Sequence, residues 1–361
     1  MDLLTEPYDL TAPTRVHSMH TTSPNTRSFF IAARHTTHMY QKILKVVEPD
    51  FQKVDKFIIE QLYSEVSLVE SIGHYIVRAG GKRMRPILVL LSARGSGLEN
   101  DQHVPMAAVI EFIHTATLLH DDVVDMSMLR RGRPTVNAEW NNPSSVLVGD
   151  FIYSRAFQIL VKISDMRIME IIANTTNKIA EGEVLQLIEK NNRESSEESY
   201  MRVITNKTAI LFQAAAKCGA ILANADPKIE EAFESFGMQL GIAFQLIDDV
   251  LDYSGNADTL GKNIGDDLAE GKSTLPLIYA MQNCSPTQRK EILKSLRAEN
   301  LSEGMLANII EIVQKSGGLD YTKKLAESRA EIAATHLKIL PESKYKESLE
   351  TMVEFSVNRK H

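Results

Sequence analysis

The sequence contains little cysteine, one tryptophan and no excess of basic residues. Among its 361 residues are two cysteines, and 40 Lys and Arg stand against 47 Asp and Glu, for a formal net charge of −7. Cys218 and Cys284 lie far apart, so they form no disulfide framework, and we expect two reduced thiols in a reducing compartment. The mild negative charge, without a basic stripe interleaved with aromatics, argues against a nucleic-acid partner.

Long apolar runs and alternating strand patterns are also missing. No run approaches the roughly 18 apolar residues that would suggest a membrane span. From Gln41 onward, apolar residues instead recur every three or four positions, as in Val54, Ile58, Leu62 and Val66, which is the period of a helix face. Most glycines and prolines lie between such segments. This predicts an all-α fold, one large single-domain helical bundle of roughly a dozen helices.

The first 38 residues differ from the rest. They are rich in Ser, Thr, His and Pro and show no sustained period, so we predict a disordered extension, residues 1–38, before a domain formed by residues 39–361. Arginines among hydroxyl residues are typical of an organelle-targeting peptide, whereas Asp2, Glu6 and Asp9 are not. We prefer a third interpretation, in which Met39 is the working start of the protein.

Three carboxylates close an unbroken apolar run. The run extends from 106 to 119, and Asp121, Asp122 and Asp125 follow it. On a helix, Asp121 and Asp125 lie one turn apart on one face. Like charges at that spacing repel, so a helix carries them at little cost only when a cation lies between them. A solvated acidic turn is the alternative interpretation.

Two arginines follow these carboxylates, Arg130 and Arg131. Mg²⁺ takes oxygen ligands and is often shared between one or two carboxylates and a substrate phosphate. Arginine forks match phosphate oxygens in two-bonded geometry. A second Asp-Asp-x-x-Asp pattern, Asp248, Asp249 and Asp252, again follows an apolar run. The pair of motifs therefore predicts two acidic helix faces that hold Mg²⁺ around one diphosphate.

Together with further motifs, these residues make the sequence similar to the trans-isoprenyl diphosphate synthases, most closely to bacterial long-chain members of the octaprenyl type. The similarity runs from about residue 39 to the C-terminus, in the order and spacing of that family. Besides the aspartates, it is carried by Gly80–Pro86, Glu111–His120, Arg130–Gly132, Gly149–Tyr153, Glu181–Gln186, Lys207-Thr208 and Gly261–Lys272.

The resemblance implies a fold and a reaction. The fold would be a helical bundle of the isoprenoid synthase type with a central active-site cavity. The reaction would be Mg²⁺-dependent, sequential condensation of isopentenyl diphosphate onto an allylic prenyl diphosphate such as farnesyl diphosphate. The expected product is octaprenyl diphosphate for quinone side chains in ubiquinone biosynthesis, with solanesyl or geranylgeranyl diphosphate as alternatives. We expect a cytoplasmic homodimer.

The resemblance also implies residue roles. Lys82 and Arg85 lie in a Gly-Gly turn just before an apolar helix, where an anion is favoured. The resemblance assigns them, with His114 and Arg131, to isopentenyl diphosphate. Groups implied to bind the allylic diphosphate are Arg130, Lys207 and Lys262. The metal would be held by Asp121, Asp125 and Asp248, with Asp122, Asp249 and Asp252 acting through water or behind them. Oxygen dipoles facing the cation would come from Thr208, Gln245 and the Lys207 carbonyl. Lys272 would seal the site, at the end of a lid formed by residues 261–271.

The length of the product depends on where the growing prenyl tail leaves the metal site. If an apolar channel runs beside the first acidic motif, the residues one helical turn back guard its mouth. Those are Ala116 and Thr117, with Phe112 a candidate for a deeper floor. Short-chain members of the family carry aromatic residues at the first two positions, so the small side chains here predict a long product. A close helix–helix contact at Ala116 is the alternative interpretation.

Two other classes of function compete with this assignment. His120-Asp121 also spells the residue pair of HD-type metal phosphohydrolases, which would leave the second acidic motif without a role. A regulatory partner subunit without activity of its own is the other alternative. Such subunits tend to lose aspartates or arginines, whereas every motif is intact here.

Overall fold

The structure is a computed structural model that describes residues 24–191, 195–254, 265–296 and 302–359. The described residues are almost entirely helical, apart from a short antiparallel hairpin of β1 (Leu129–Arg130) and β2 (Arg133–Pro134). The all-α prediction is therefore confirmed. Among the described helices, none combines the length and the apolar character needed to cross a membrane.

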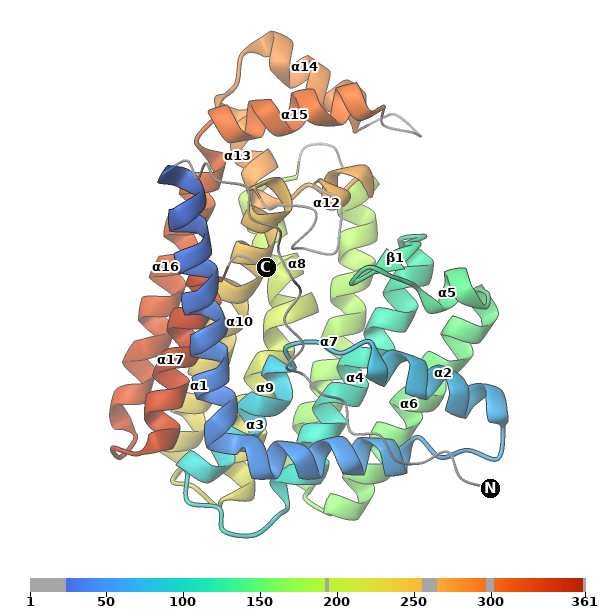
Figure 1. Cartoon of the computed structure of the whole chain (residues 1–361), viewed down its shortest axis with the longest axis vertical. Helices are drawn as coiled ribbons and strands as arrows, with labels where there is room; N and C mark the ends of the chain where they lie inside the picture. The colour runs from blue at the N-terminus through green and yellow to red at the C-terminus, as the bar shows by residue number, and fades with distance from the viewer. Residues whose placement is uncertain (1–23, 192–194, 255–264, 297–301, 360–361) are drawn as a thin grey trace, which may run out of the picture.

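Long helices form the body of the molecule (Figure 1). The central ones are α3 (Met84–Gly95), α4 (His103–Val124), α6 (Asn142–Ile163), α7 (Met166–Asn191), α9 (Ile210–Leu222) and α10 (Pro227–Ser254). One side is covered by α1 (Pro24–Gln61), α16 (Gly318–His336) and α17 (Lys344–Asn358), and one end by α13 (Leu275–Asn283), α14 (Pro286–Ser295) and α15 (Glu303–Lys315). Shorter elements are α2 (Ser67–Arg78), α5 (Val136–Glu139), α8 (Glu197–Ile204), the π-helical turn η1 (Thr205–Ala209), α12 (Asp266–Ala269) and the 3₁₀ turn η2 (Leu337–Ile339).

Helix α1 corrects the prediction for the N-terminal segment. It begins at Pro24, so residues 24–38 are helical, although we expected no regular structure there; residues 1–23 lie outside the described part. Thr36 is buried and its Oγ1 donates to the Asn358 carbonyl of α17 at 3.2 Å. Figure 1 shows α1 in two arms at a large angle, and Pro49, which lies inside the helix, removes a backbone donor and bends it.

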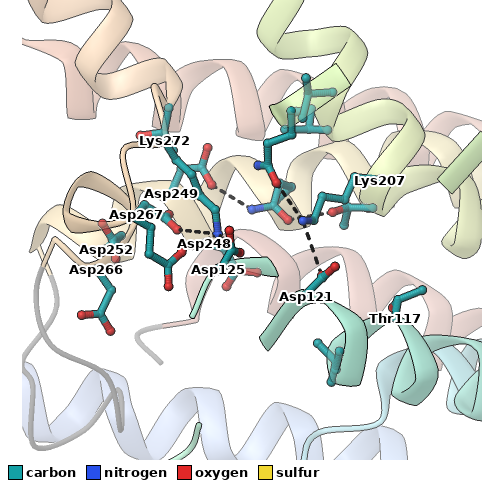
Figure 2. A pocket seen from close by; sticks show the side chains of 18 of the residues that line it. Thr117, Asp121, Asp125, Lys207, Asp248, Asp249, Asp252, Asp266, Asp267 and Lys272 are labelled. Carbon is teal, nitrogen blue, oxygen red and sulfur yellow. Dashed lines mark hydrogen bonds and ion pairs between the residues drawn. The ribbon is translucent and has the colours of Figure 1, made fainter. Parts of the chain in front are cut away.

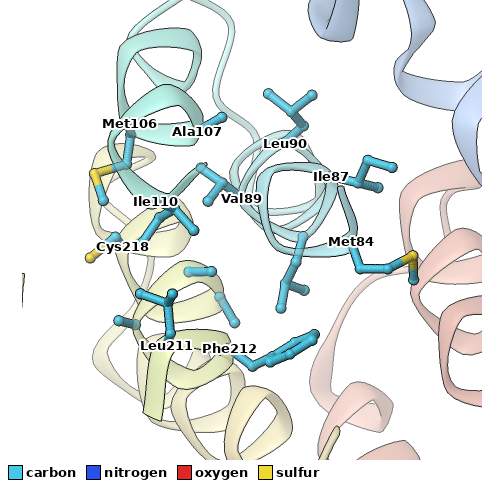
Figure 3. Close-up of a cluster of buried hydrophobic side chains, with 14 of the residues drawn as sticks. Met84, Ile87, Val89, Leu90, Met106, Ala107, Ile110, Leu211, Phe212 and Cys218 are labelled. Carbon is cyan, nitrogen blue, oxygen red and sulfur yellow. The ribbon is translucent and has the colours of Figure 1, made fainter. Parts of the chain in front are cut away.

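The centre of the core is helix α3, which is apolar on all sides. Ile87, Leu88, Val89, Leu90 and Leu91 all have 0% exposure. A helix that is apolar all round is stable only when other elements cover every face. Figure 3 shows side chains of α3 pointing outward in several directions, with residues of α4 and α9 packed against them. The fully buried Cys218 of α9 belongs to this cluster and is a free thiol, as is Cys284.

Close approach of α3 and α9 depends on Gly219. A Cβ built there would lie 2.8 Å from the Val89 carbonyl oxygen and would overlap the Ser92 hydroxyl. We expect Gly219→Ala to lower the free energy of unfolding by about 1–3 kcal/mol, the usual cost of overpacking a core. Gly304→Ala is the matched control in α15, where an added Cβ meets nothing within 4 Å, and it should raise stability by about 0.4–1 kcal/mol. Urea unfolding measures both, and equal effects at the two positions would contradict the packing argument.

Candidate active site

The two acidic motifs meet at one cavity. Asp121 and Asp125 lie at the C-terminal end of α4, whereas Asp248 and Asp252 lie in the last turns of α10. All four line a cavity of about 770 Å³ (Figure 2). Because unpaired carbonyls already give helix C-termini a partial negative charge, the carboxylates require cations nearby. The cavity therefore has the charge and the oxygen donors that suit divalent cations.

Cationic side chains from distant parts of the chain pair with these carboxylates. Lys207 Nζ lies 3.4 Å from Asp121 Oδ2. Lys272 Nζ lies 2.8 Å from Asp125 Oδ2, with Lys190 3.5 Å from its other oxygen. At this distance two like charges would raise the electrostatic free energy by about as much as these ion pairs lower it. The balance of charges in the cavity therefore decides its geometry.

Asp122 and Asp249 are the buried members of the two motifs, although Asp249 also lines the cavity. Asp122 is 4% exposed and accepts from Arg130, whose Nη2 lies 2.6 Å from its Oδ1. Asp249 is 2% exposed and accepts from the Tyr200 hydroxyl at 2.5 Å and from Gln245 Nε2 at 2.8 Å. Burial and nearby Asp267 raise the pKa of Asp249 to about 8, while these hydrogen bonds act in the opposite direction. Both carboxylates thus hold other side chains in place.

Lys82, Arg85 and Arg131 are basic side chains of the cavity, and we call them the basic wall. The Gly80-Gly81 turn has φ values of 67° and 145°, and a Cβ at Gly81 would lie 2.6 Å from Arg131 Nη1. The positive φ values favour glycine at both positions, and the turn continues through Lys82 and the N-cap residue Arg83 into α3. Lys82, Arg85 and Arg131 all line the cavity, where the positive end of the helix adds to their charge.

His114 belongs to the same wall and is neutral. Its Nε2 lies 3.2 Å from Arg85 Nη1. Burial, and the Arg85 guanidinium beside it, lower the pKa of His114 well below its usual value, so the ring nitrogen accepts from Arg85. Arg85 also lies over the Phe212 ring, 4.5 Å from its centroid. The guanidinium is thereby held in one orientation toward the cavity.

The hairpin after α4 supplies the two predicted arginines. Its turn residues Arg131 and Gly132 both have positive φ, 53° and 72°, the geometry of a two-residue hairpin turn that follows strand twist. Arg130 consequently reaches Asp122, and Arg131 donates to the Gly80 carbonyl. One tight turn therefore presents one arginine to each side of the cavity.

The π-helical turn η1 positions Lys207 and Thr208. Lys207 Nζ donates to Glu183 Oε2 at 2.6 Å and to Gln186 Oε1 at 2.8 Å. Thr208 Oγ1 donates to Gln245 Oε1 at 2.9 Å. Single π-helical turns are frequent at functional sites because they rotate side chains out of the regular helical order.

Three further residues that line the cavity were not predicted from the sequence. Arg359 is 5% exposed, its Nη1 lies 2.5 Å from Asp248 Oδ1, and its guanidinium lies 3.7 Å from the Phe244 ring centroid. Glu183 has a pKa raised to about 7 by burial and by nearby Asp121. Glu183 lies within a motif that the sequence analysis used for the resemblance, so its spacing held a signal. No local pattern identified Arg359 or Tyr200.

Other predicted residues have mixed outcomes. Lys262 lies outside the described residues, as does the first part of the predicted lid, residues 261–264. The described remainder leads to Lys272, and Glu270 accepts from the Ser127 hydroxyl at 3.2 Å. Thr117 lines the cavity, whereas Ala116 is fully buried and Phe112 borders a separate cavity of about 30 Å³.

His120 lies apart from the carboxylates that line the cavity. Its Nε2 lies 3.2 Å from the Val146 carbonyl and 3.3 Å from Asp150 Oδ1, both on α6. The imidazole is therefore turned away from the cavity, and the geometry does not favour an HD-type phosphohydrolase. A further acidic cluster, Asp50 with Asp101 and His103, is neutralised by Arg94, whose Nε lies 2.8 Å from Asp50.

Comparison with known proteins places this geometry in context. The polyprenyl synthetase family model matches residues 66–313. The chain is 47% identical over 319 residues to octaprenyl diphosphate synthase of Escherichia coli (strain K12), covering 88% of this chain and 98% of that protein. It is 49% identical over 320 residues to the all-trans-nonaprenyl-diphosphate synthase (geranyl-diphosphate specific) of Rhodobacter capsulatus, with coverages of 88% and 98%.

A solved structure gives the same result for the fold. The crystal structure of a polyprenyl synthase from Caulobacter crescentus CB15, complexed with calcium and isoprenyl diphosphate, superposes with a TM-score of 0.87 at 40% identity. The match covers 89% of this chain and 98% of that one. A divalent cation and a diphosphate thus accompany this fold in that protein.

Proposed function

This chain belongs to the polyprenyl synthetase family and is a prenyltransferase, and we propose that it condenses isopentenyl diphosphate sequentially onto an allylic diphosphate, with farnesyl diphosphate as the expected primer. The observation that carries the proposal is the meeting of two acidic helix ends and a basic wall around one cavity. The acidic half and the basic half of the cavity each suit one diphosphate. The acidic half would bind a diphosphate through Mg²⁺, and the basic half would bind one directly.

We assign the metal to three of the aspartates that line the cavity. Asp121, Asp125 and Asp248 would hold Mg²⁺, and Asp122, Asp249 and Asp252 would support them from behind or through water. When bound, the metal neutralises the allylic diphosphate and makes it a good leaving group. Further positive charge would come from Arg130, Lys207, Lys262 and Lys272. The assignment of one domain also remains a proposal, and helix α1 extends its start from residue 39 back to Pro24.

The chemistry then needs no protein nucleophile. The allylic C–O bond breaks, and pyrophosphate leaves with the bonding electrons. The double bond of isopentenyl diphosphate forms the new C–C bond to the allylic carbon, and a proton is lost to the departing pyrophosphate. Thr208, Gln245 and the Lys207 carbonyl would present oxygen dipoles to the positive charge on carbon. The basic wall of Lys82, Arg85, His114 and Arg131 would hold isopentenyl diphosphate for this attack.

Octaprenyl diphosphate for a quinone side chain is the proposed product. Relatives of nearly equal identity carry octaprenyl and nonaprenyl names, so overall similarity does not decide chain length. The small side chains of Ala116 and Thr117 support a long product. Solanesyl and geranylgeranyl diphosphate are the alternatives.

We also propose a cytoplasmic homodimer. Helices α6 and α7 expose apolar side chains that a single chain leaves uncovered, among them Leu147, Val161, Val184 and Ile188. Exposed apolar residues along neighbouring helices are typical of protein–protein interfaces. Sedimentation velocity measures the assembly, and a species at the 40.4 kDa mass of one chain would contradict it.

Product analysis tests the function and its chain length together. Wild-type protein with farnesyl diphosphate, labelled isopentenyl diphosphate and Mg²⁺ should give a long product by chromatography. Ala116→Tyr should give a much shorter one while ionisation survives, because the ring would close the tail channel. Thr117→Phe, at a position that lines the cavity, should act in the same direction. Unchanged long product from both active variants would show that the channel runs elsewhere.

Removal of a metal ligand should abolish turnover without unfolding the protein. Asp121→Asn and Asp248→Asn each remove a charge that lines the cavity, not core volume. Mg²⁺ with pyrophosphate should raise the melting temperature of the wild type, since a ligand at 100 times its Kd stabilises by about 2.7 kcal/mol, and should not raise that of either variant. Asp50→Asn, in the cluster neutralised by Arg94, is the control that keeps the shift. A full Mg²⁺ shift in Asp121→Asn would refute the metal assignment.

The basic wall generates a pH prediction. Burial, with Arg359 and Arg131 nearby, lowers the pKa of Lys82 to about 8. Only the protonated amine binds a diphosphate well, so kcat/KM for isopentenyl diphosphate should fall as the pH rises through about 8. Lys82→Arg keeps its charge and should move this fall to higher pH.

Alanine variants assign the same wall to one substrate. Lys82→Ala and Arg85→Ala should raise KM for isopentenyl diphosphate more than KM for the allylic substrate, each losing a charged contact worth roughly 1.5–3 kcal/mol. If both substrates were weakened equally, or if Lys82→Arg kept the wild-type pH profile, the wall would supply general electrostatics only.

A further inference from the structure

Tyr200 is a buried polar side chain at the cavity that the mechanism above does not use. It lies in α8, seven residues before Lys207, and lines the cavity while remaining only 5% exposed. Its hydroxyl donates to Asp249 Oδ2 at 2.5 Å. A buried hydrogen bond is costly to leave unmade, so this contact fixes Asp249 against α8.

The contact continues through Asp249 to the residues that face the cavity. Asp249 Oδ1 accepts from Gln245 Nε2 at 2.8 Å, and Gln245 Oε1 accepts from Thr208 Oγ1 at 2.9 Å. Asp249 therefore faces the nitrogen end of the amide. The oxygen end of Gln245 is thereby turned toward Thr208, and both side chains line the cavity.

Asp249 needs the hydrogen bond from Tyr200 because neighbouring charges favour other positions of its carboxyl group. It follows Asp248, which faces the cavity, and like charges on Asp248 and Asp267 act on it. A cation bound among these carboxylates would attract Asp249 as well. If Asp249 swung toward it, Gln245 would lose the acceptor that fixes its amide, and its oxygen and nitrogen ends would exchange readily.

We propose that Tyr200 is a positioning residue, which holds Asp249 away from the metal and thereby keeps the carbonyl oxygen of Gln245 oriented for the positive charge that develops on the prenyl chain. This inference rests on the proposed function. Dipoles fixed in advance need no reorganisation during reaction. Tyr200 therefore contributes to the rate of ionisation and condensation and not to substrate binding.

Tyr200→Phe tests the assignment, because it removes one oxygen and keeps the ring. We expect kcat to fall roughly tenfold. Loss of a direct oxyanion-hole donor lowers kcat by ~10²–10³, and the effect here should be smaller because Tyr200 acts through Asp249 and Gln245. KM for both diphosphates should stay within twofold. So should the calorimetric Kd of the non-ionising thiolo analogue of farnesyl diphosphate, measured with Mg²⁺.

Tyr253→Phe is the matched control. Tyr253 is a fully buried tyrosine of α10, and its hydroxyl meets Thr274 at 3.5 Å and not Asp249. Its loss should leave kcat unchanged. A double variant separates positioning from general damage: in a Gln245→Ala background, Tyr200→Phe should lower kcat no further, because the group that it orients is gone.

The outcomes are distinguishable. A wild-type protein that makes no prenyl product would refute the proposed function itself. With an active wild type, an unchanged kcat in Tyr200→Phe would overturn the inference alone. So would a loss of analogue affinity that matches the loss of kcat, because Tyr200 would then act on the metal site. A further tenfold loss in the Gln245→Ala background would likewise show that Tyr200 supports the fold and not the amide.

Discussion

Repulsion between carboxylates at two helix ends is the constraint on which the rest of the site depends. Two unit charges 4 Å apart interact by about 1 kcal/mol in water and about 4 kcal/mol near a protein surface. The carbonyls at the C-terminal ends of α4 and α10 add to this negative potential. The chain therefore brings cations to the cavity from η1, from the segment before α13, from the β1–β2 hairpin and from the C-terminus, which supply Lys207, Lys272, Arg130 and Arg359. Their pairing joins elements that are distant in sequence.

The apolar core holds these concentrated charges in fixed positions. Helix α3 is buried on every side, and its N-terminus opens into the cavity beside Lys82. Because the helix cannot shift without exposing apolar surface, the basic wall that it begins is held at a fixed place. The two halves of the cavity, one acidic and one basic, are thus set by packing that lies outside the cavity itself.

Chain length is the property that the shared architecture leaves most open. The acidic and basic residues of the cavity lie at helix ends and turns, whereas a prenyl tail would run along helix faces. Thr117 borders the cavity, and Ala116 is packed within the core in this structure. Relatives of nearly equal identity carry names of different chain lengths, so overall similarity does not determine the size of the product.

The sequence by itself determined the helical class, the two acidic motifs and the basic turn, because these depend on local periods and spacings. The 3.6-residue period also distinguishes Asp121 and Asp125, which face the cavity, from Asp122, which turns away. The sequence by itself did not determine that residues 24–38 are helical. That segment lacks a sustained apolar period, and Thr36 finds its contact with Asn358 at the far end of the chain. The partnerships of Arg359 with Asp248 and of Tyr200 with Asp249 were likewise decided only by the tertiary structure. Local spacing fixes which face of a helix a residue occupies, but only packing of distant segments fixes what lies opposite that face.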